Sequence, residues 1–307
     1  MNTKLSPTKY FNMYINLELY RIFYITAKLG SISKAAKELF TSQPAVSQSI
    51  KLLEGKLGGE LFHRTPRGVS LTLEGEVLFK YIEQGYGLMM TAERKFSELK
   101  NLNSDQIRIA VCSAVCKYYL MKYIETYNLN YPNIKIYVKD KSSYEIAKAL
   151  DLGEIDIGIL NMNIDTSNPL NIIKTFKIQD CFVVGEKYKE ICEKQITLKD
   201  LVDRYPIILL EKGGNTRGYI DNYFSSHGLD VVPQIELSNV ELMIEFAKRG
   251  LGVSCIIKDY VKKELEQEQL YDISIKEKIP ERIMGIATKK DIPMSTAAER
   301  FINLIED

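Results

Sequence analysis

The sequence predicts an α/β fold preceded by a small, mostly helical N-terminal domain. Two observations support this class. Apolar residues recur at helical spacing up to about residue 102, and beyond it short β-branched runs alternate with helical patterns. At 307 residues, 45% of them hydrophobic and 26% charged, the chain is long enough for two or three domains. We expect these over residues 15–73, 74–102 and 103–307.

Charge is distributed unevenly along the chain. Residues 1–72 hold ten Lys or Arg and four acidic residues, a net +6, whereas the whole chain carries +1, so the rest carries −5. A basic end is typical of a chain that meets a polyanion there. No apolar run approaches the ~18 residues of a spanning helix, and the N-terminus lacks the apolar segment of a secretion signal. We therefore expect no membrane association and a cytoplasmic location.

Two short helices are expected first. An apolar repeat starts at residue 17, and Gly30 stands where a left-handed residue would end that helix. Ser31 or Ser33 can cap a second helix over residues 34–40. A short break then separates it from the next helical pattern.

A third helix can be capped by Ser42, with Pro44 in its first turn. The stripe predicted to face the first two helices consists of Val46, Ile50, Leu53 and Leu57. The opposite side collects six residues that we name the recognition face: Ser42, Gln43, Pro44, Ser47, Gln48 and Lys51. Amides pair with adenine, hydroxyls adapt, and lysine reaches phosphate or guanine. Three helices in this order predict a helix-turn-helix, which presents such a face to the major groove of double-stranded DNA.

A hairpin is predicted next, over residues 61–72, around Pro66, Arg67 and Gly68. Arg64 and Arg67 lie near its tip, where they can bind phosphates or enter the minor groove. Taken alone, a polar helix face and a basic hairpin are also typical of an ordinary solvated surface. Their succession favours a winged helix-turn-helix.

A long helix follows, capped by Thr72 and running to about Leu102. Its apolar residues near one face are Leu78, Tyr81, Leu88, Ala92, Phe96 and Leu99. A helix of ~30 residues spans ~45 Å, which is too long for a small domain to cover. Pairing with a second copy is the natural solution, and a homodimer would present two recognition faces to a near-palindromic operator.

The remaining sequence predicts two α/β lobes joined by two crossovers, with lobe I over 103–164 and 268–307 and lobe II over 165–267. The expected strands are 107–111, 134–139, 155–160, 181–185, 207–210, 235–237, 253–256, 270–275 and 283–288. The expected helices are 117–129, one opened by 142–145, 216–227, 240–248 and 296–305. Ser238 and Glu241 are expected to form a capping box for the helix at 240.

The run from Gly213 to Arg217 can turn backbone N–H groups at a helix start toward a ligand, beside a hydroxyl and a guanidinium. That chemistry suits a carboxylate or another anion. A flexible loop with a surface arginine and an ordinary threonine cap explains the same residues.

Many of these positions together resemble the LysR-type transcriptional regulators. The N-terminal motifs that carry the resemblance are Ser31–Ala36, Ser42–Ser47, Leu53–Glu54, Leu57–Gly58, Leu61–Phe62, Arg64 and Gly68–Thr72. Further along they are Tyr131–Ile134, Gly153–Ile159, Thr216–Arg217 and Gly250–Val253, so the resemblance covers nearly the whole chain from Leu17. The chain departs from many members at Gln48, where they carry arginine, and in having few hydroxyls over 111–114.

The resemblance implies a sequence-specific DNA-binding regulator whose activity is modulated by a small, anionic effector. It implies a periplasmic-binding-protein-like effector domain, a homodimer or homotetramer, and a ligand in the crevice beyond the carboxyl ends of the strands. By matched position the effector-binding residues are Cys112, Ser113, Ala114, Ser143, Gly214, Asn215, Thr216 and Arg217.

Other functions fit less of the sequence. Cys112 and Cys116 lie four apart, which leaves a thiol-based redox-sensing regulator of the same family as an alternative. A cytosolic solute-binding protein could share the two lobes but would not need the basic N-terminal region. A DNA-binding protein without sequence preference would have the same basic N-terminal region. We expect no enzyme, cofactor or metal site, because the chain has two histidines and no HExxH, P-loop or GxGxxG motif.

Overall fold

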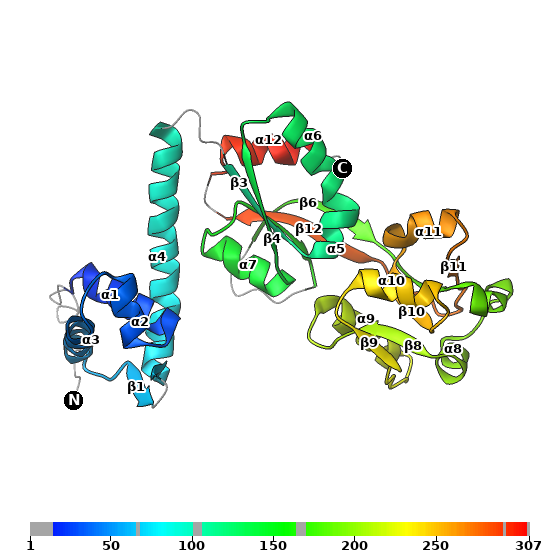
Figure 1. The fold of residues 1–307 in the computed structure, drawn as a ribbon, viewed down its shortest axis with the longest axis horizontal. Helices are drawn as coiled ribbons and strands as arrows, with labels where there is room; N and C mark the ends of the chain where they lie inside the picture. The colour runs from blue at the N-terminus through cyan, green and yellow to red at the C-terminus, as the bar shows by residue number, and fades with distance from the viewer. Residues whose placement is uncertain (1–14, 66–67, 101–105, 164–169, 291–292, 306–307) are drawn as a thin grey trace, which may run out of the picture. The chain divides into compact units, whose positions relative to one another are not determined.

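The computed structural model describes residues 15–65, 68–100, 106–163, 170–290 and 293–305 (Figure 1). The chain forms two compact units that divide between Arg94 and Lys95. No helix among the residues described is long and apolar enough to cross a membrane.

The first unit is a winged helix-turn-helix followed by a long helix, as predicted. Its elements are α1 (Leu17–Leu29), α2 (Ile32–Glu38), α3 (Gln43–Leu57), β1 (Phe62–Thr65), β2 (Gly68–Leu71) and α4 (Leu73–Lys100). Gly30 ends α1 in the left-handed region at φ 61°. Of the two candidate caps for α2 the structure uses Ser31, whose side chain accepts from the Lys34 N–H. Strands β1 and β2 pair antiparallel from Phe62 opposite Leu71 to Thr65 opposite Gly68.

The core of this unit lies where the three short helices meet. Phe23, Val46 and Leu53 are fully buried, and Ile50 nearly so. Leu57, which we predicted to belong to the buried stripe, is 37% exposed. It is the last residue of α3, where the helix ends at Gly58 and the other two helices no longer cover it.

Close backbone contacts attach the hairpin to the helices around it. The Val69 N–H donates to the Gly30 carbonyl at 3.0 Å. A Cβ at Gly68 would lie 2.3 Å from that carbonyl oxygen, and one at Gly75 would lie 2.2 Å from the Leu61 oxygen. Both positions therefore require glycine, which fixes the hairpin against α1 and the start of α4.

The second unit contains two five-stranded sheets (Figure 1). The first has the order β4-β3-β5-β12-β6, made of β3 (Gln106–Val111), β4 (Lys135–Asp140), β5 (Ile157–Asn161), β6 (Leu170–Ile178) and β12 (Arg282–Lys289). The second has the order β11-β7-β10-β8-β9, made of β7 (Asp180–Val184), β8 (Ile207–Leu210), β9 (Ile235–Leu237), β10 (Val253–Ile257) and β11 (Tyr271–Asp272). Around the first sheet lie α5 (Ser113–Val115), a π-helical turn η2 (Cys116–Leu120), α6 (Met121–Asn130), α7 (Ser143–Asp151) and α12 (Thr296–Leu304). The helices around the second sheet are η3 (Glu186–Glu193), α8 (Leu198–Arg204), α9 (Asn215–Ser226), α10 (Val240–Lys248), η4 (Lys258–Val261) and α11 (Lys262–Glu266).

The expected lobe boundaries are wrong at both crossovers. Strand β6 pairs with β12 in the first sheet, so lobe II does not begin at residue 165. Strand β11 pairs with β7 in the second sheet, so lobe I does not resume at residue 268. The chain passes between the sheets near residue 179 and again between 272 and 282. Pairing across about a hundred residues decides sheet membership, and hydrophobic periodicity does not contain that information.

Three helix starts also differ from expectation. Helix α2 begins at Ile32 and ends at Glu38, earlier than the predicted 34–40, because Ser31 is its N-cap. Helix α10 is capped by Asn239, whose side chain accepts from the Leu242 N–H at 2.9 Å, and not by a Ser238 box. The helical segment after β3 begins at Ser113, earlier than the predicted 117, because Cys112 is already its N-cap. This places Ser113 at the carboxyl end of β3.

Candidate functional site

The recognition face lies at the start of α3. Gln43, Pro44, Gln48 and Lys51 are exposed, as is the cap Ser42, whose Oγ accepts from the Ala45 N–H at 3.4 Å. Ser47 is half-buried. Val46 and Ile50, on the other side of the same turns, are buried against the other helices. The six residues therefore form a polar surface held in place by a packed helix.

One hairpin side chain contacts this face. Arg64 on β1 is exposed, and its Nη2 donates to Ser47 Oγ at 3.4 Å. The contact puts the guanidinium beside the recognition face of α3. Arg67, the second predicted hairpin contact, lies outside the residues described.

Helix α4 carries apolar side chains that are exposed among the residues described. Tyr81 and Leu88 of the predicted stripe are 68% and 46% exposed, and Val77 is exposed as well. Leu78 instead packs with Phe79 and Ile82 on the core of the first unit. The exposed apolar side of α4 therefore includes Val77 in place of the predicted Leu78, because the first turns of α4 also pack on α1.

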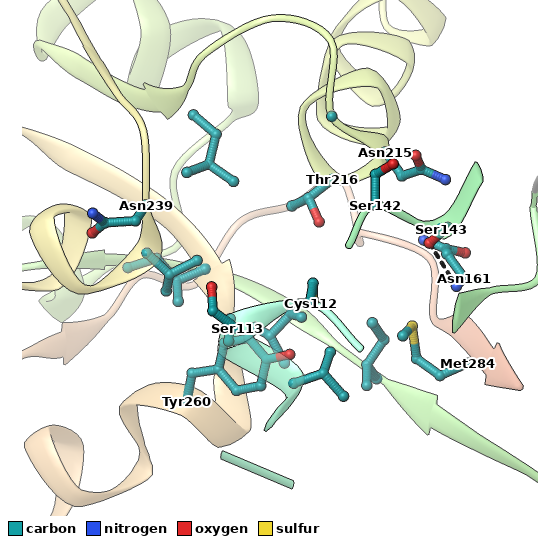
Figure 2. Close-up of a pocket in the computed structure, with 18 of the residues that line it drawn as sticks. Cys112, Ser113, Ser142, Ser143, Asn161, Asn215, Thr216, Asn239, Tyr260 and Met284 are labelled. Atoms are coloured by element: carbon teal, nitrogen blue, oxygen red, sulfur yellow. Dashed lines mark hydrogen bonds between the residues drawn. The ribbon is translucent and has the colours of Figure 1, made fainter. Parts of the chain in front are cut away.

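A cavity of about 270 Å³ lies between the two sheets of the second unit (Figure 2). Seven of the eight residues predicted to bind an effector line it: Cys112, Ser113, Ala114, Ser143, Gly214, Asn215 and Thr216. Apolar side chains such as Ile178, Met243 and Met284 form much of the remaining wall. The cavity therefore combines an apolar body with polar groups at helix starts.

Four helix N-termini of the second unit meet the cavity, and they differ in how they are capped. Helix α5 starts after Cys112 without a cap from that residue, but its Ser113 N–H already donates to Asp140 Oδ1 at 2.9 Å. Ser142 caps α7 through a reciprocal box with Glu145, and these hydrogen bonds lower the pKa of Glu145. Asn239 caps α10. Helix α9 starts after Gly214 without a side-chain cap. Among the described hydrogen bonds none occupies the N–H groups of Asn215 and Thr216, so α9 is the start best suited to accept a ligand oxygen.

Arg217 does not line the cavity, which corrects the prediction. Its side chain is 2% exposed, and its Nε donates to Asp221 at 2.8 Å. Its Nη1 donates to Glu236 and to the Leu210 carbonyl, both at 2.5 Å. One residue after Thr216 the helix has turned by ~100°, so the guanidinium points to β8 and β9 and joins α9 to its own sheet.

Eight polar or charged residues of the wall were not predicted from the sequence to bind an effector: Asp140, Lys141, Ser142, Asn161, Ser238, Asn239, Tyr260 and Arg282. Asn161 is buried and ends the apolar strand β5, and its N–H donates to Ser143 Oγ at 3.1 Å. A polar residue closing an otherwise apolar strand is the signal that could have identified it. Arg282 carries no comparable signal, since a single arginine before a strand is common.

The two candidate redox thiols have the wrong electrostatics for that role. Burial raises the pKa of Cys112, and burial also raises the pKa of Cys116, with the Asp140 carboxylate adding to both effects. Reactive thiols require a lowered pKa. All five cysteines are free, and the described residues contain no His, Cys, Asp and Glu cluster that could hold a metal.

Comparison with known families agrees with this geometry. Residues 17–76 match the family described as bacterial regulatory helix-turn-helix protein, lysR family. Residues 100–307 match the LysR substrate binding domain, which alone covers more than half of the chain. The chain belongs to the LysR family of transcriptional regulators. It therefore has a helix-turn-helix DNA-binding domain and an effector-binding domain, and it is a regulator and not an enzyme or a free-standing solute-binding protein.

Relatives of this LysR-family regulator align over most of its length. A probable RuBisCO transcriptional regulator of Emiliania huxleyi is 28% identical over 275 residues, covering 88% of this chain and 87% of that one. Full-length CbnR complexed with its target DNA has a TM-score of 0.62 at 15% identity, covering 95% and 99% of the two chains. The regulatory domain of Synechocystis PCC6803 CcmR in complex with 2-PG has a TM-score of 0.58 at 22% identity, covering 65% and 95%. These two structures show the shared fold.

Proposed function

We propose that this regulator binds a near-palindromic operator as a homodimer or homotetramer through its recognition face and changes its action when a small anionic effector occupies the cavity. We place the protein in the cytoplasm, where it would encounter both the operator and the effector. Residues 15–73 serve as the DNA-binding domain, 74–102 as the dimerisation helix and the remainder as the effector domain.

The recognition face supports the first half of the proposal. Gln43, Gln48 and Lys51 are exposed amide and ammonium groups on the first turns of a packed helix, the arrangement that major-groove readout requires. Arg64 adds a cation at the edge of that face. CbnR, which shares the fold, has been solved on its target DNA.

The exposed stripe of α4 supports an oligomer. Val77, Tyr81 and Leu88 lie along one side of a 28-residue helix and are exposed among the residues described. A second α4 would bury them and set the spacing of two recognition faces.

The uncapped start of α9 inside the cavity is the observation on which the effector site depends most. Backbone N–H groups, the Thr216 hydroxyl and the positive end of the helix dipole meet there, and all three favour an anionic oxygen. CcmR, whose regulatory domain has the same fold, holds 2-PG.

A footprint with purified protein tests this function when repeated with a panel of small carboxylates and phosphate esters. Thr216→Val should abolish the response to the active compound and leave basal operator protection unchanged. Thr126→Val is the matched control, because Thr126 is exposed on α6 and its hydroxyl bonds only the Lys122 carbonyl of its own helix. An unchanged response in Thr216→Val would place the effector elsewhere.

A further inference from the structure

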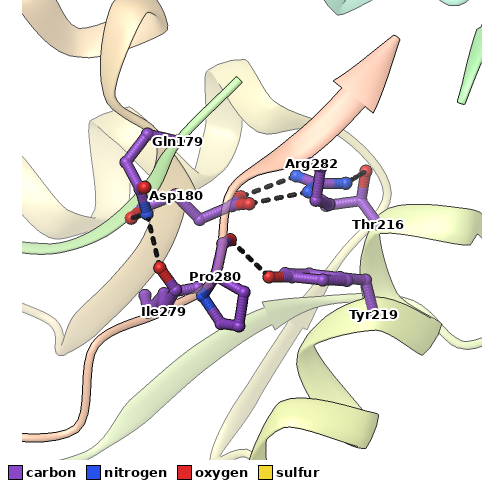
Figure 3. A network of polar contacts seen from close by, with 7 residues as sticks. All are labelled: Gln179, Asp180, Thr216, Tyr219, Ile279, Pro280 and Arg282. Carbon is purple, nitrogen blue, oxygen red and sulfur yellow. Dashed lines mark hydrogen bonds and ion pairs between the residues drawn. The ribbon is translucent and has the colours of Figure 1, made fainter. Parts of the chain in front are cut away.

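A buried ion pair joins the two crossovers of the second unit (Figure 3). Arg282 Nε and Nη2 donate to Asp180 Oδ2 and Oδ1, both at 2.7 Å. The two side chains are 1% and 0% exposed. Asp180 begins β7 in the second sheet and Arg282 begins β12 in the first, so the pair bridges the lobes at the point where the chain passes between them.

Neighbouring groups hold this pair in one geometry. The guanidinium lies 4.7 Å from the centre of the Tyr219 ring, and Tyr219 Oη donates to the Pro280 carbonyl at 2.6 Å. Gln179 Nε2 donates to the Ile279 carbonyl at 3.0 Å. Both crossovers are thereby fixed beside each other and beside α9, and Arg282 has little freedom to turn away from Asp180.

The same arginine forms part of the cavity wall. Its Nη1 donates to Thr216 Oγ1 at 3.4 Å, a long contact that a stronger acceptor can replace. A guanidinium has five N–H groups, and those on Nε and Nη2 that serve Asp180 leave Nη1 facing the start of α9. A ligand oxygen bound at α9 would meet Nη1.

The charges around the cavity cancel. Lys141 and Asp140 line the wall together with Arg282, and Asp180 lies directly behind Arg282. Acidic groups already occupy three of the helix starts at the cavity: Glu145 lies in the first turn of α7, Glu241 in that of α10, and Asp140 accepts from the first N–H of α5. The remaining positive potential therefore comes mainly from α9, whose N-terminus is equivalent to about half a charge. This environment can compensate a single negative charge, whereas a second one would be buried without a partner.

We propose that Asp180 determines effector specificity: by neutralising Arg282 it restricts the cavity to a ligand with a singly charged anionic group, such as a carboxylate, and excludes doubly charged phosphate. This inference rests on the anion site proposed at α9. It makes Asp180 a positioning residue that acts through Arg282 and does not itself touch the ligand.

Titration calorimetry of the full-length protein with butyrate and inorganic phosphate tests the inference at about pH 9, where nearly all of the phosphate is doubly charged. Wild type should bind butyrate at least ~10-fold more tightly than phosphate, because phosphate would bring an uncompensated charge into the cavity. Asp180→Asn should gain phosphate affinity by ~10-fold or more, while its butyrate affinity changes less. Asp180→Ser is a second neutral variant, in case the asparagine protein does not fold.

Two controls separate this effect from net charge and from phosphate bound elsewhere. Glu281→Gln removes the same charge one residue from Arg282, but Glu281 is half-exposed and pairs with Lys177 at 2.7 Å, so phosphate affinity should match wild type. Adding Arg282→Gln to Asp180→Asn should abolish the gain. A wild type that prefers phosphate, or a folded neutral variant without the gain, would overturn the role of Asp180. Failure of both probes to bind any of these proteins would overturn the anion site itself.

Discussion

The two units of this regulator build their sites in opposite ways. The six residues of the recognition face lie within one stretch, 42 to 51, formed by α3 and its N-cap. The cavity collects wall residues from Cys112 to Met284, supplied by both sheets and several helix starts. A local site depends on one helix being well packed, whereas a distributed site depends on every strand pairing correctly. Substitutions should therefore separate the two functions sharply.

The largest expected effect is on the fold of the first unit. Gly75→Val would place a Cβ 2.2 Å from the Leu61 carbonyl oxygen, which the backbone cannot accommodate without moving. We expect a loss of several kcal/mol in the stability of that unit, of the order typical for severe steric strain. Calorimetric melting should show the first unit unfolding early and the second unchanged. Gly85→Val is the control, since nothing lies within 4 Å of a Cβ there; an equal loss would contradict the steric argument.

Next in size is the loss of base readout. Gln48→Ala should weaken operator binding by ~1–3 kcal/mol and leave random DNA nearly unaffected, because the amide contacts a base edge. Arg64→Ala should weaken both DNAs alike and reduce the salt dependence, as removal of a phosphate contact does. Fluorescence anisotropy at several salt concentrations distinguishes the two. Equal losses on both DNAs for Gln48→Ala would show that α3 does not enter the groove.

Arg217 tests whether a buried cation next to the cavity serves structure or binding. Arg217→Met removes its bonds to Asp221 and Glu236 but keeps the buried aliphatic stem. Both acids are partly exposed and can be rehydrated, so we expect about 1–2 kcal/mol of destabilisation in urea unfolding. Effector affinity should be retained. A selective loss of affinity without destabilisation would return Arg217 to the cavity wall.

The smallest expected effect is that of mild oxidation. Because burial raises the pKa of the Cys112 and Cys116 thiols, little thiolate exists at neutral pH. Operator affinity should stay within about twofold after peroxide treatment, and mass spectrometry should find Cys112 unmodified. A peroxide-dependent change that disappears in Cys112→Ser would revive the redox alternative.

The contrast between the units also explains what sequence could predict. Helix caps such as Ser31 and Ser42 and the glycine at 30 act over a few residues, so the elements of the first unit were predicted to within about two residues. The position of Thr216 in the cavity followed from the glycine-rich helix start and the family pattern. The placement of β6 did not follow, because it is decided by pairing with β12 more than a hundred residues later.

The same reasoning applies to the two arginines. Arg217 follows Thr216 directly and was predicted to share its site, yet the helix turn directs it to Glu236. Arg282 enters the cavity only because two crossovers bring it to Asp180. Nothing local distinguishes the cation that lines the cavity from the one that does not.

The most direct test is a paired measurement on full-length Gln48→Ala and Thr216→Val, with operator binding followed by anisotropy and ligand binding followed by calorimetry. We predict that Gln48→Ala loses its preference for the operator while binding the effector like wild type. Thr216→Val should keep the operator preference and lose the effector. If either variant lost both functions while remaining folded, the assignment of recognition to α3 and of sensing to the cavity would be contradicted.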